Sequence, residues 1–91
     1  MKLVFDPEAW REYESWQAED MKIVARINTL IRECLRHPFT GTGKPEPLKR
    51  DLAGWWSRRI SQEHRLVYRV RGTGETQLLE VLSCRYHWVF V

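Results

Sequence analysis

The stretch that decides the fold is WWSRRISQEHRLVYRVRGTGETQLLEVLSCRYHWVFV, residues 55–91. It contains three segments rich in β-branched and aromatic residues, a composition typical of β-strands. They cover residues 55–60, 64–71 and 76–91. The polar pieces between them, SQE and GTGE, are typical of hairpin turns. The C-terminal part of the chain therefore predicts antiparallel strands that follow one another along the sequence.

The residues before this stretch predict one more strand and two helices. The apolar run KLVF at 2–5 suits a strand, and Asp6 and Pro7 suit the cap and first residue of a helix. A second helix is expected over about 19–37, where apolar residues recur every three to four positions and Pro38 follows. The join between the two helices, near Glu19 and Asp20, has no strong helix breaker, and we expect a helical hairpin rather than one very long helix.

This order predicts an α+β fold, β-α-α-β-β-β, with an antiparallel β-sheet and the two helices packed on one face. The 91 residues, 43% of them hydrophobic, fit a single domain over 1–91. The chain has no apolar run long enough for a membrane span, and Asp6 comes too early for a secretory signal. We therefore expect a cytoplasmic protein, with Cys34 and Cys84 as reduced core thiols rather than a disulfide.

The formal charge of +3 hides an asymmetry along the chain. Residues 1–21 carry two basic and six acidic side chains, a net of −4, whereas residues 22–91 have a net of +7. A basic region of this kind suits a polyanion such as nucleic acid, or an acidic protein partner. A solvated basic face with no ligand is the alternative.

The segment 38–53 has four Gly and Pro residues after Pro38 and no periodicity, so we expect a loop. Within it Glu46 lies between Pro45 and Pro47, among several basic residues. Each proline fixes its own φ, and Pro47 also disfavours a helical conformation at Glu46. This glutamate is either an ordinary turn residue or a carboxylate held in place for a function.

Alternation along the strand 64–71 separates its polar and apolar side chains. Leu66, Tyr68 and Val70 share the face expected to pack on the helices. Arg65 and Arg69 then project from the open face.

In the last strand, the same alternation puts Arg85 and His87 on one side. Leu79 and Val81 fall on that side too, as they would in a strand buried on both faces. With this phase, an arginine and a histidine from adjacent strands share the open face, and the loop that carries Glu46 borders it.

Glutamate, arginine and histidine can together cleave RNA without a metal. The 2′-OH needs a base, the phosphate oxygens need a cation such as the planar arginine fork, and the departing 5′-oxygen needs a proton from a group such as histidine. A glutamate, with an ordinary pKa of about 4.3, is a weak base, so Glu46 must be partly buried or must mainly orient the 2′-OH. Each residue type also has a common structural role, and Trp55 and Trp56 suit either base stacking or core packing.

Two stretches carry a family resemblance: GTGKPEPLKRDLAGWWSRRISQEHRLVYRV (41–70) and SCRYHW (83–88). With them the chain resembles, over nearly its whole length, the YoeB (Txe) family of toxins within the RelE-like mRNA interferases. The resemblance implies a RelE-like (microbial RNase-like) fold and ribosome-dependent cleavage of mRNA in the A site, without a metal or other cofactor. It also implies a YefM-like antitoxin encoded beside the toxin, a toxin–antitoxin complex on operator DNA, and compatibility with a homodimer.

By this resemblance, Glu46 in KPEPLK is the general base, Arg65 in EHRLVY steadies the phosphate, and His87 in CRYH is the general acid. Glu63 is expected to orient His87. The basic residues expected to bind RNA phosphates are Lys44, Lys49, Arg59, Arg69 and Arg85.

One residue departs from the family pattern: Trp88 stands where better-known members have tyrosine after the catalytic histidine. An indole has one N–H and no titratable acid, so any role of that hydroxyl is lost or performed otherwise. The alternative function is a catalytically impaired homologue that only binds antitoxin and operator. A metal-dependent DNase is disfavoured, because the sequence has no cluster of metal ligands.

Overall fold

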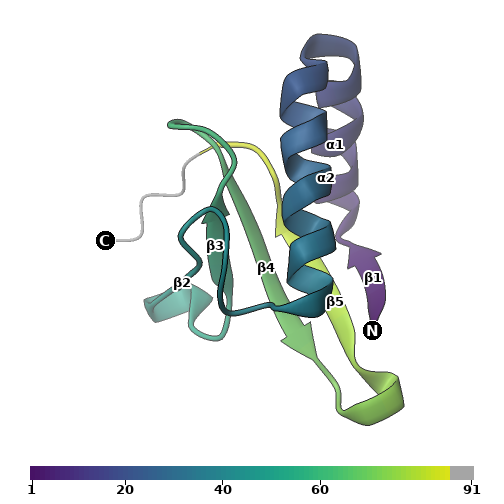
Figure 1. Cartoon of the computed structure of the whole chain (residues 1–91), viewed down its shortest axis with the longest axis vertical. Helices are drawn as coiled ribbons and strands as arrows, with labels where there is room; N and C mark the ends of the chain where they lie inside the picture. The colour runs from purple at the N-terminus through teal and green to yellow at the C-terminus, as the bar shows by residue number, and fades with distance from the viewer. Residues whose placement is uncertain (87–91) are drawn as a thin grey trace.

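A mixed sheet of five strands and two α-helices make up the part of the chain that the computed structural model describes, residues 1–86 (Figure 1). The elements are β1 (Lys2–Phe5), α1 (Pro7–Glu19), α2 (Met21–Arg36), β2 (Glu46–Pro47), β3 (Trp56–Arg59), β4 (Arg65–Arg71) and β5 (Leu78–Ser83). This confirms the α+β fold and the predicted order of strands and helices. The expected loop contains one further strand, β2.

The order of strands in the sheet is β1-β5-β4-β3-β2. Four of them pair antiparallel, but β1 runs parallel to β5, with Lys2 opposite Leu78 and Phe5 opposite Val81. The prediction of a wholly antiparallel sheet was therefore wrong in this pair. Alternation within KLVF shows which residues share a face, but it does not encode the direction of a partner more than seventy residues away.

Asp20 joins the two helices. It ends α1, and its side chain accepts hydrogen bonds from the backbone N–H groups of Lys22 and Ile23 at the start of α2. Asp6 caps α1 in the same way, and Pro7 is the first helical residue. The helical hairpin is confirmed, and its turn depends on one capping aspartate.

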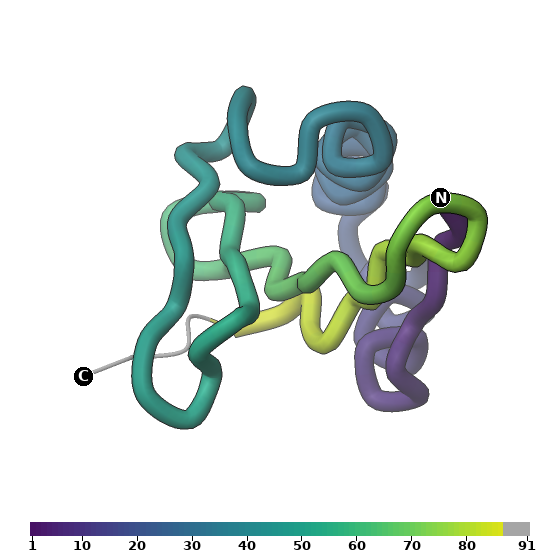
Figure 2. The backbone as a smooth tube through the Cα atoms, turned by 90° about the horizontal axis from the view of Figure 1, so that it is seen from below, coloured from purple at the N-terminus to yellow at the C-terminus, as the bar shows by residue number. Residues whose placement is uncertain are grey.

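Both helices contribute to one hydrophobic cluster with the sheet. Ala9 and Trp16 of α1 and Ile27 and Leu30 of α2 are buried in it. Leu66, Tyr68, Leu79 and Val81 are the strand residues of the cluster that are fully buried. The helix-facing side of β4 was therefore predicted correctly. Figure 2 shows the segment after α2 crossing from the helices to the opposite edge of the sheet.

A β-bulge explains the mixed phase of the last strand. Val67 pairs with Ser83, but the next residue, Tyr68, pairs with Val81. In a regular strand Val81 and Cys84 would point to opposite faces, because they are three residues apart. The extra residue lets both of them enter the hydrophobic cluster. We expected the alternation to continue unbroken along the last strand, which would have buried it on both faces. The bulge breaks the alternation, so this expectation was wrong.

The two cysteines, Cys34 and Cys84, are buried and not joined in a disulfide, as predicted. Burial raises the pKa of the Cys84 thiol to about 12, with the nearby Glu12 carboxylate acting in the same direction. Neither α1 nor α2 has the length and apolar character that crossing a membrane requires, in the part of the chain described.

Candidate functional site

The segment that carries Glu46 is fastened to the edge of the sheet. Glu46 pairs with Ser57 of β3. On either side of this pair, the Gly43 carbonyl accepts from the Arg59 N–H at 2.7 Å and the Leu48 N–H donates to the Trp55 carbonyl at 2.8 Å. The flanking prolines are tolerated because an edge strand needs no donor on its outer side. Glu46 is therefore held by an edge strand and not by a free loop.

Strand register brings Glu46 and Arg65 to the same face. Ser57 lies between Glu46 on β2 and Val67 on β4, so these three side chains form one row. Arg59 and Arg65 are paired in the next row on that face. This face lies opposite the helix-facing Leu66 and Tyr68, as the alternation predicted for Arg65.

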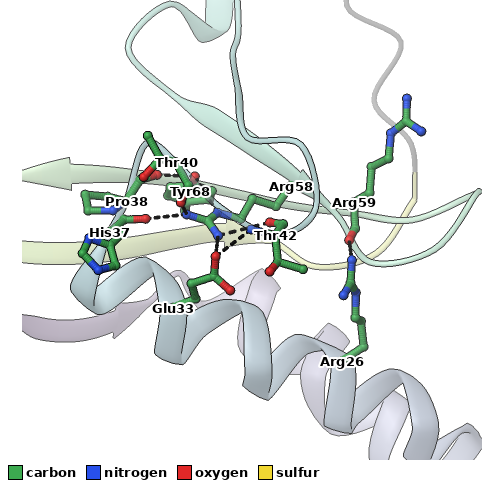
Figure 3. Close-up of polar contacts among 9 residues, drawn as sticks. All are labelled: Arg26, Glu33, His37, Pro38, Thr40, Thr42, Arg58, Arg59 and Tyr68. Carbon is green, nitrogen blue, oxygen red and sulfur yellow. Dashed lines mark hydrogen bonds and ion pairs between the residues drawn. The ribbon is translucent and has the colours of Figure 1, made fainter.

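The charges of this face act on one another. The pKa of Arg65 lies below its ordinary value, because partial burial and the neighbouring Arg59 disfavour its charge, while Glu46 favours it. Figure 3 shows the Arg59 side chain extending away from α2, while Arg26 reaches back to the Arg59 carbonyl at 2.9 Å. An anion beside these two arginines would relieve their mutual repulsion.

Arg65 is anchored to the turn between β3 and β4. Its Nη1 donates to the carbonyls of Ser61 at 2.8 Å, Gln62 at 3.2 Å and His64 at 3.1 Å. A guanidinium has five N–H donors, so one nitrogen fixes the side chain and others can serve a ligand.

The residues that follow β5 contact the turn between β3 and β4. The Arg65 N–H donates to the Tyr86 carbonyl at 3.1 Å, and the Tyr86 N–H donates to His64 Nδ1 at 2.7 Å. Glu63 is exposed in the same turn. The sequence reasoning missed His64 as an anchor, although it stands beside Arg65 in the EHR motif. His87 and Trp88 lie outside the described residues.

The predicted phosphate-binding residues divide into two groups. Lys44, Lys49 and Arg59 are exposed on or beside the strands that hold Glu46. Arg69 forms an ion pair with Glu80 at 2.9 Å and stacks on Trp55 at 4.2 Å.

Arg85 is directed elsewhere. It pairs with Glu19 of α1 at 2.8 Å and lies over the Trp16 ring at 4.0 Å. The structure therefore does not bring Arg85 to the face of Glu46.

A family model described as the YoeB-like toxin of bacterial type II toxin-antitoxin system matches residues 5–88. The chain belongs to this family. The Toxin YoeB of Escherichia coli K12 is 52% identical over 88 residues, which cover 97% of this chain and 100% of that protein. This agrees with the resemblance that KPEPLK, EHRLVY and SCRYHW carry.

Solved structures agree with the YoeB assignment. The YoeB/ParE toxin from Agrobacterium tumefaciens is 58% identical, with a TM-score of 0.93 over 97% of this chain and 100% of that one. Staphylococcus aureus YoeB, solved as a dimer, is 40% identical, with a TM-score of 0.86 over 97% of this chain and 98% of that one. The toxin of a YoeB–YefM complex from the same organism is 39% identical, with a TM-score of 0.84 over the same shares of the two chains.

In this YoeB-family chain a second arginine of β3 has a role that the sequence reasoning missed. Arg58 is fully buried and donates to Glu33, to Tyr68 and to three loop carbonyls (Figure 3). Alternation was the available signal, because it puts Arg58 on the inner side with Trp56 and Ile60 while Arg59 faces out. Among residues 1–86, no three His, Cys, Asp or Glu side chains are grouped to hold a metal ion.

Glu33 makes the stability of this cluster sensitive to acid. The backbone N–H and the hydroxyl of Thr42 hold the pKa of Glu33 below its ordinary value, and Arg58 adds to the effect. Because the folded-state pKa is the lower one, this stabilisation is present above about pH 4.3 and is lost as the pH falls through the folded-state pKa.

We predict that Glu33→Gln lowers the free energy of unfolding at pH 7 and makes that free energy fall less steeply in acid. Urea unfolding between about pH 3 and 7 measures both effects, with Glu14→Gln, exposed on α1, as the control. An acid profile for Glu33→Gln that matches the wild type would contradict it.

Proposed function

We propose that this YoeB-family toxin cleaves mRNA in the A site of the ribosome, without a metal, by attack of the RNA's own 2′-OH. The observation that carries the proposal is the pairing of β2 with β3, which sets Glu46 on the same face as Arg59 and Arg65. A carboxylate beside two cations provides both a proton acceptor and a phosphate site.

The reaction assigns one task to each group. Glu46 takes the proton of the 2′-OH while the 2′-oxygen bonds to phosphorus. Arg65 donates hydrogen bonds to the phosphate oxygens as their negative charge grows. The bond from phosphorus to the 5′-oxygen breaks, and His87 gives that oxygen a proton. The products are a 2′,3′-cyclic phosphate, which water can hydrolyse to a 3′-phosphate with release of the 2′-OH, and a 5′-hydroxyl.

Glu46 is exposed in the free chain, so the burial expected of a stronger base is not yet present. Bound RNA would supply it, because a nucleotide lying over β2 covers the carboxylate and excludes water. Before that, the edge strand contributes orientation: it fixes the position of the carboxylate against Arg65.

Phosphates on either side of the cleaved bond are proposed to meet Lys44, Lys49 and Arg59, which are exposed around Glu46. Arg69 has a lesser part, because Glu80 already pairs with it. Arg85 is left out of this surface, since its guanidinium pairs with Glu19. We also propose that Glu63 orients His87 and that Trp88 stacks on a base.

The proposed partners follow from the family. A YefM-like antitoxin would neutralise the toxin, as the YoeB–YefM complex from Staphylococcus aureus suggests, and the joint complex would bind operator DNA. A homodimer is proposed by comparison with the YoeB dimer of that organism. Translating ribosomes as the target place the activity in the cytoplasm.

The 2′-OH is the decisive test. An mRNA on the ribosome with a single 2′-deoxy nucleotide at the cleaved bond should not be cleaved at that bond, because the nucleophile itself is missing. The deoxy position is moved through the A-site codon, so that all-ribose mRNA and neighbouring deoxy positions serve as controls. Equal cleavage at every deoxy position would refute the mechanism. Antitoxin binding with no cleavage of all-ribose mRNA would favour the catalytically impaired homologue.

A further inference from the structure

Arg58 of β3 is the largest fully buried side chain among residues 1–86, with 0% of its surface exposed. Arginine is almost never fully buried unless it is paired. Here the guanidinium pairs with the Glu33 carboxylate at 3.2 Å, and its Nε donates to the Tyr68 hydroxyl at 3.2 Å. Among residues 1–86, the acidic group paired with this buried charge is therefore Glu33 of α2.

The segment between α2 and β2 folds around this guanidinium, as Figure 3 shows. Nη1 donates to the Thr42 carbonyl at 3.1 Å, and Nη2 donates to the carbonyls of Thr40, at 2.8 Å, and His37. None of these three carbonyls belongs to a helix or a strand. One side chain thus supplies the hydrogen bonds that a regular backbone would otherwise supply.

Two glycines let the segment approach closely. At Gly41, with φ of +117°, a Cβ would lie 1.8 Å from Glu33 Oε1. At Gly43, with φ of +86°, it would lie 3.2 Å from the Arg58 Cβ and from the Arg59 backbone. A side chain at either point would therefore require the Glu33 carboxylate or β3 to shift, and both glycines also have the positive φ that favours glycine.

This packing leads directly to Glu46. The Gly43 carbonyl bonds to the Arg59 N–H, and three residues later Glu46 pairs with Ser57. Arg58 lies between Ser57 and Arg59 in β3, and its side chain points to the inner side while theirs point to the outer one. The residue that gathers the segment and the residues that receive Glu46 are thus neighbours on one strand.

Stability alone does not account for such a residue. A buried ion pair contributes little net stability and can often be replaced by apolar side chains, whereas a polar group of this kind can select one conformation. We propose that Arg58 is a positioning residue: it fixes the segment 37–43 on β3 and thereby holds Glu46 in place to act on RNA. This inference rests on the proposed function of Glu46.

The test is Arg58→Lys, which keeps the charge but loses the planar fork. A displacement of Glu46 by about 1 Å should lower kcat for cleavage on the ribosome by about 100-fold, with a much smaller change in KM. Hydrogen exchange should become faster at the amides of Thr42 and Arg59, which bond to Glu33 and to Gly43. Arg11→Lys is the matched control, because Arg11 pairs with Glu8 on the exposed side of α1.

Coupling to Glu46 separates positioning from a general loss of structure. In a Glu46→Ala background, Arg58→Lys should cause no further loss of the residual cleavage, because the residue it positions is gone. Equal losses in both backgrounds would overturn the proposal, as would unchanged amide exchange in Arg58→Lys. If Arg58→Lys does not fold, Tyr68→Phe decides, since that hydroxyl binds Arg58 and donates to the Pro38 carbonyl.

The wild-type chain separates this inference from the function on which it rests. No cleavage by the wild type refutes the proposed function, while the exchange measurement still tests whether Arg58 holds the segment 37–43. Cleavage by the wild type together with an unchanged kcat in Arg58→Lys refutes the positioning role alone.

Discussion

Arg65→Ala is expected to lower the rate of mRNA cleavage on the ribosome by about 10³-fold or more. An arginine that stabilises a phosphoryl transition state contributes about 10³- to 10⁵-fold to its rate. In this chain the guanidinium is already fixed by three carbonyls of the β3–β4 turn, so little reorganisation is needed when phosphate charge develops. Single-turnover cleavage of mRNA in programmed ribosomes measures the effect.

Arg71→Ala is the matched control for this prediction. Arg71 lies on the same strand and pairs with Glu80 at 2.9 Å, so its loss removes one positive charge without touching the site. Arg65→Lys should recover only part of the rate. The planar guanidinium can donate to the turn and to the phosphate at the same time, whereas the compact lysine ammonium cannot reproduce this geometry. Thermal unfolding and antitoxin binding show whether each variant is folded. An Arg65→Ala protein that is folded and fully active would rule out the phosphate role.

Local pattern was enough to predict much of this fold. The cap at Asp6 begins the first helix, and the alternation of Leu66, Tyr68 and Val70 identifies the packed face of β4. Two features depend on contacts that no local pattern contains. These are the parallel pairing of β1 with β5, and the bulge opposite Val67 and Tyr68.

The candidate site shows the same division. The flanking prolines predicted the stiff backbone at Glu46, and the alternation of side chains along a strand predicted that Arg65 points away from the helices. The pairing of Glu46 with Ser57 was not, because two prolines usually argue against a strand and only an edge position tolerates them.

The roles of individual arginines were harder still to predict. One residue type occupies three environments here: Arg58 is buried, Arg59 is exposed, and Arg85 is paired with Glu19. Composition gives each of them the same charge, and only the packed structure decides which of them can meet a phosphate.

Glu46→Ala and Glu46→Gln together ask what the carboxylate does. Proton transfer by a positioned base is worth about 10²- to 10⁴-fold, so Glu46→Ala should lose at least about 100-fold in cleavage rate. Glutamine keeps the shape and the hydrogen-bonding reach of glutamate but cannot take the proton. We therefore expect Glu46→Gln to lose nearly as much as Glu46→Ala.

Neither change should unfold the protein, because Glu46 is exposed on an edge strand and surface substitutions usually change stability by no more than about 0.5 kcal/mol. Asp51→Asn, an exposed acid in the nearby turn Arg50–Leu52, is the control for the loss of one negative charge. If Glu46→Gln keeps most of the wild-type rate while Glu46→Ala loses it, Glu46 orients the 2′-OH and does not deprotonate it. If both Glu46 variants keep the wild-type rate, another group is the general base. The pairing of β2 with β3 would then have a structural role only.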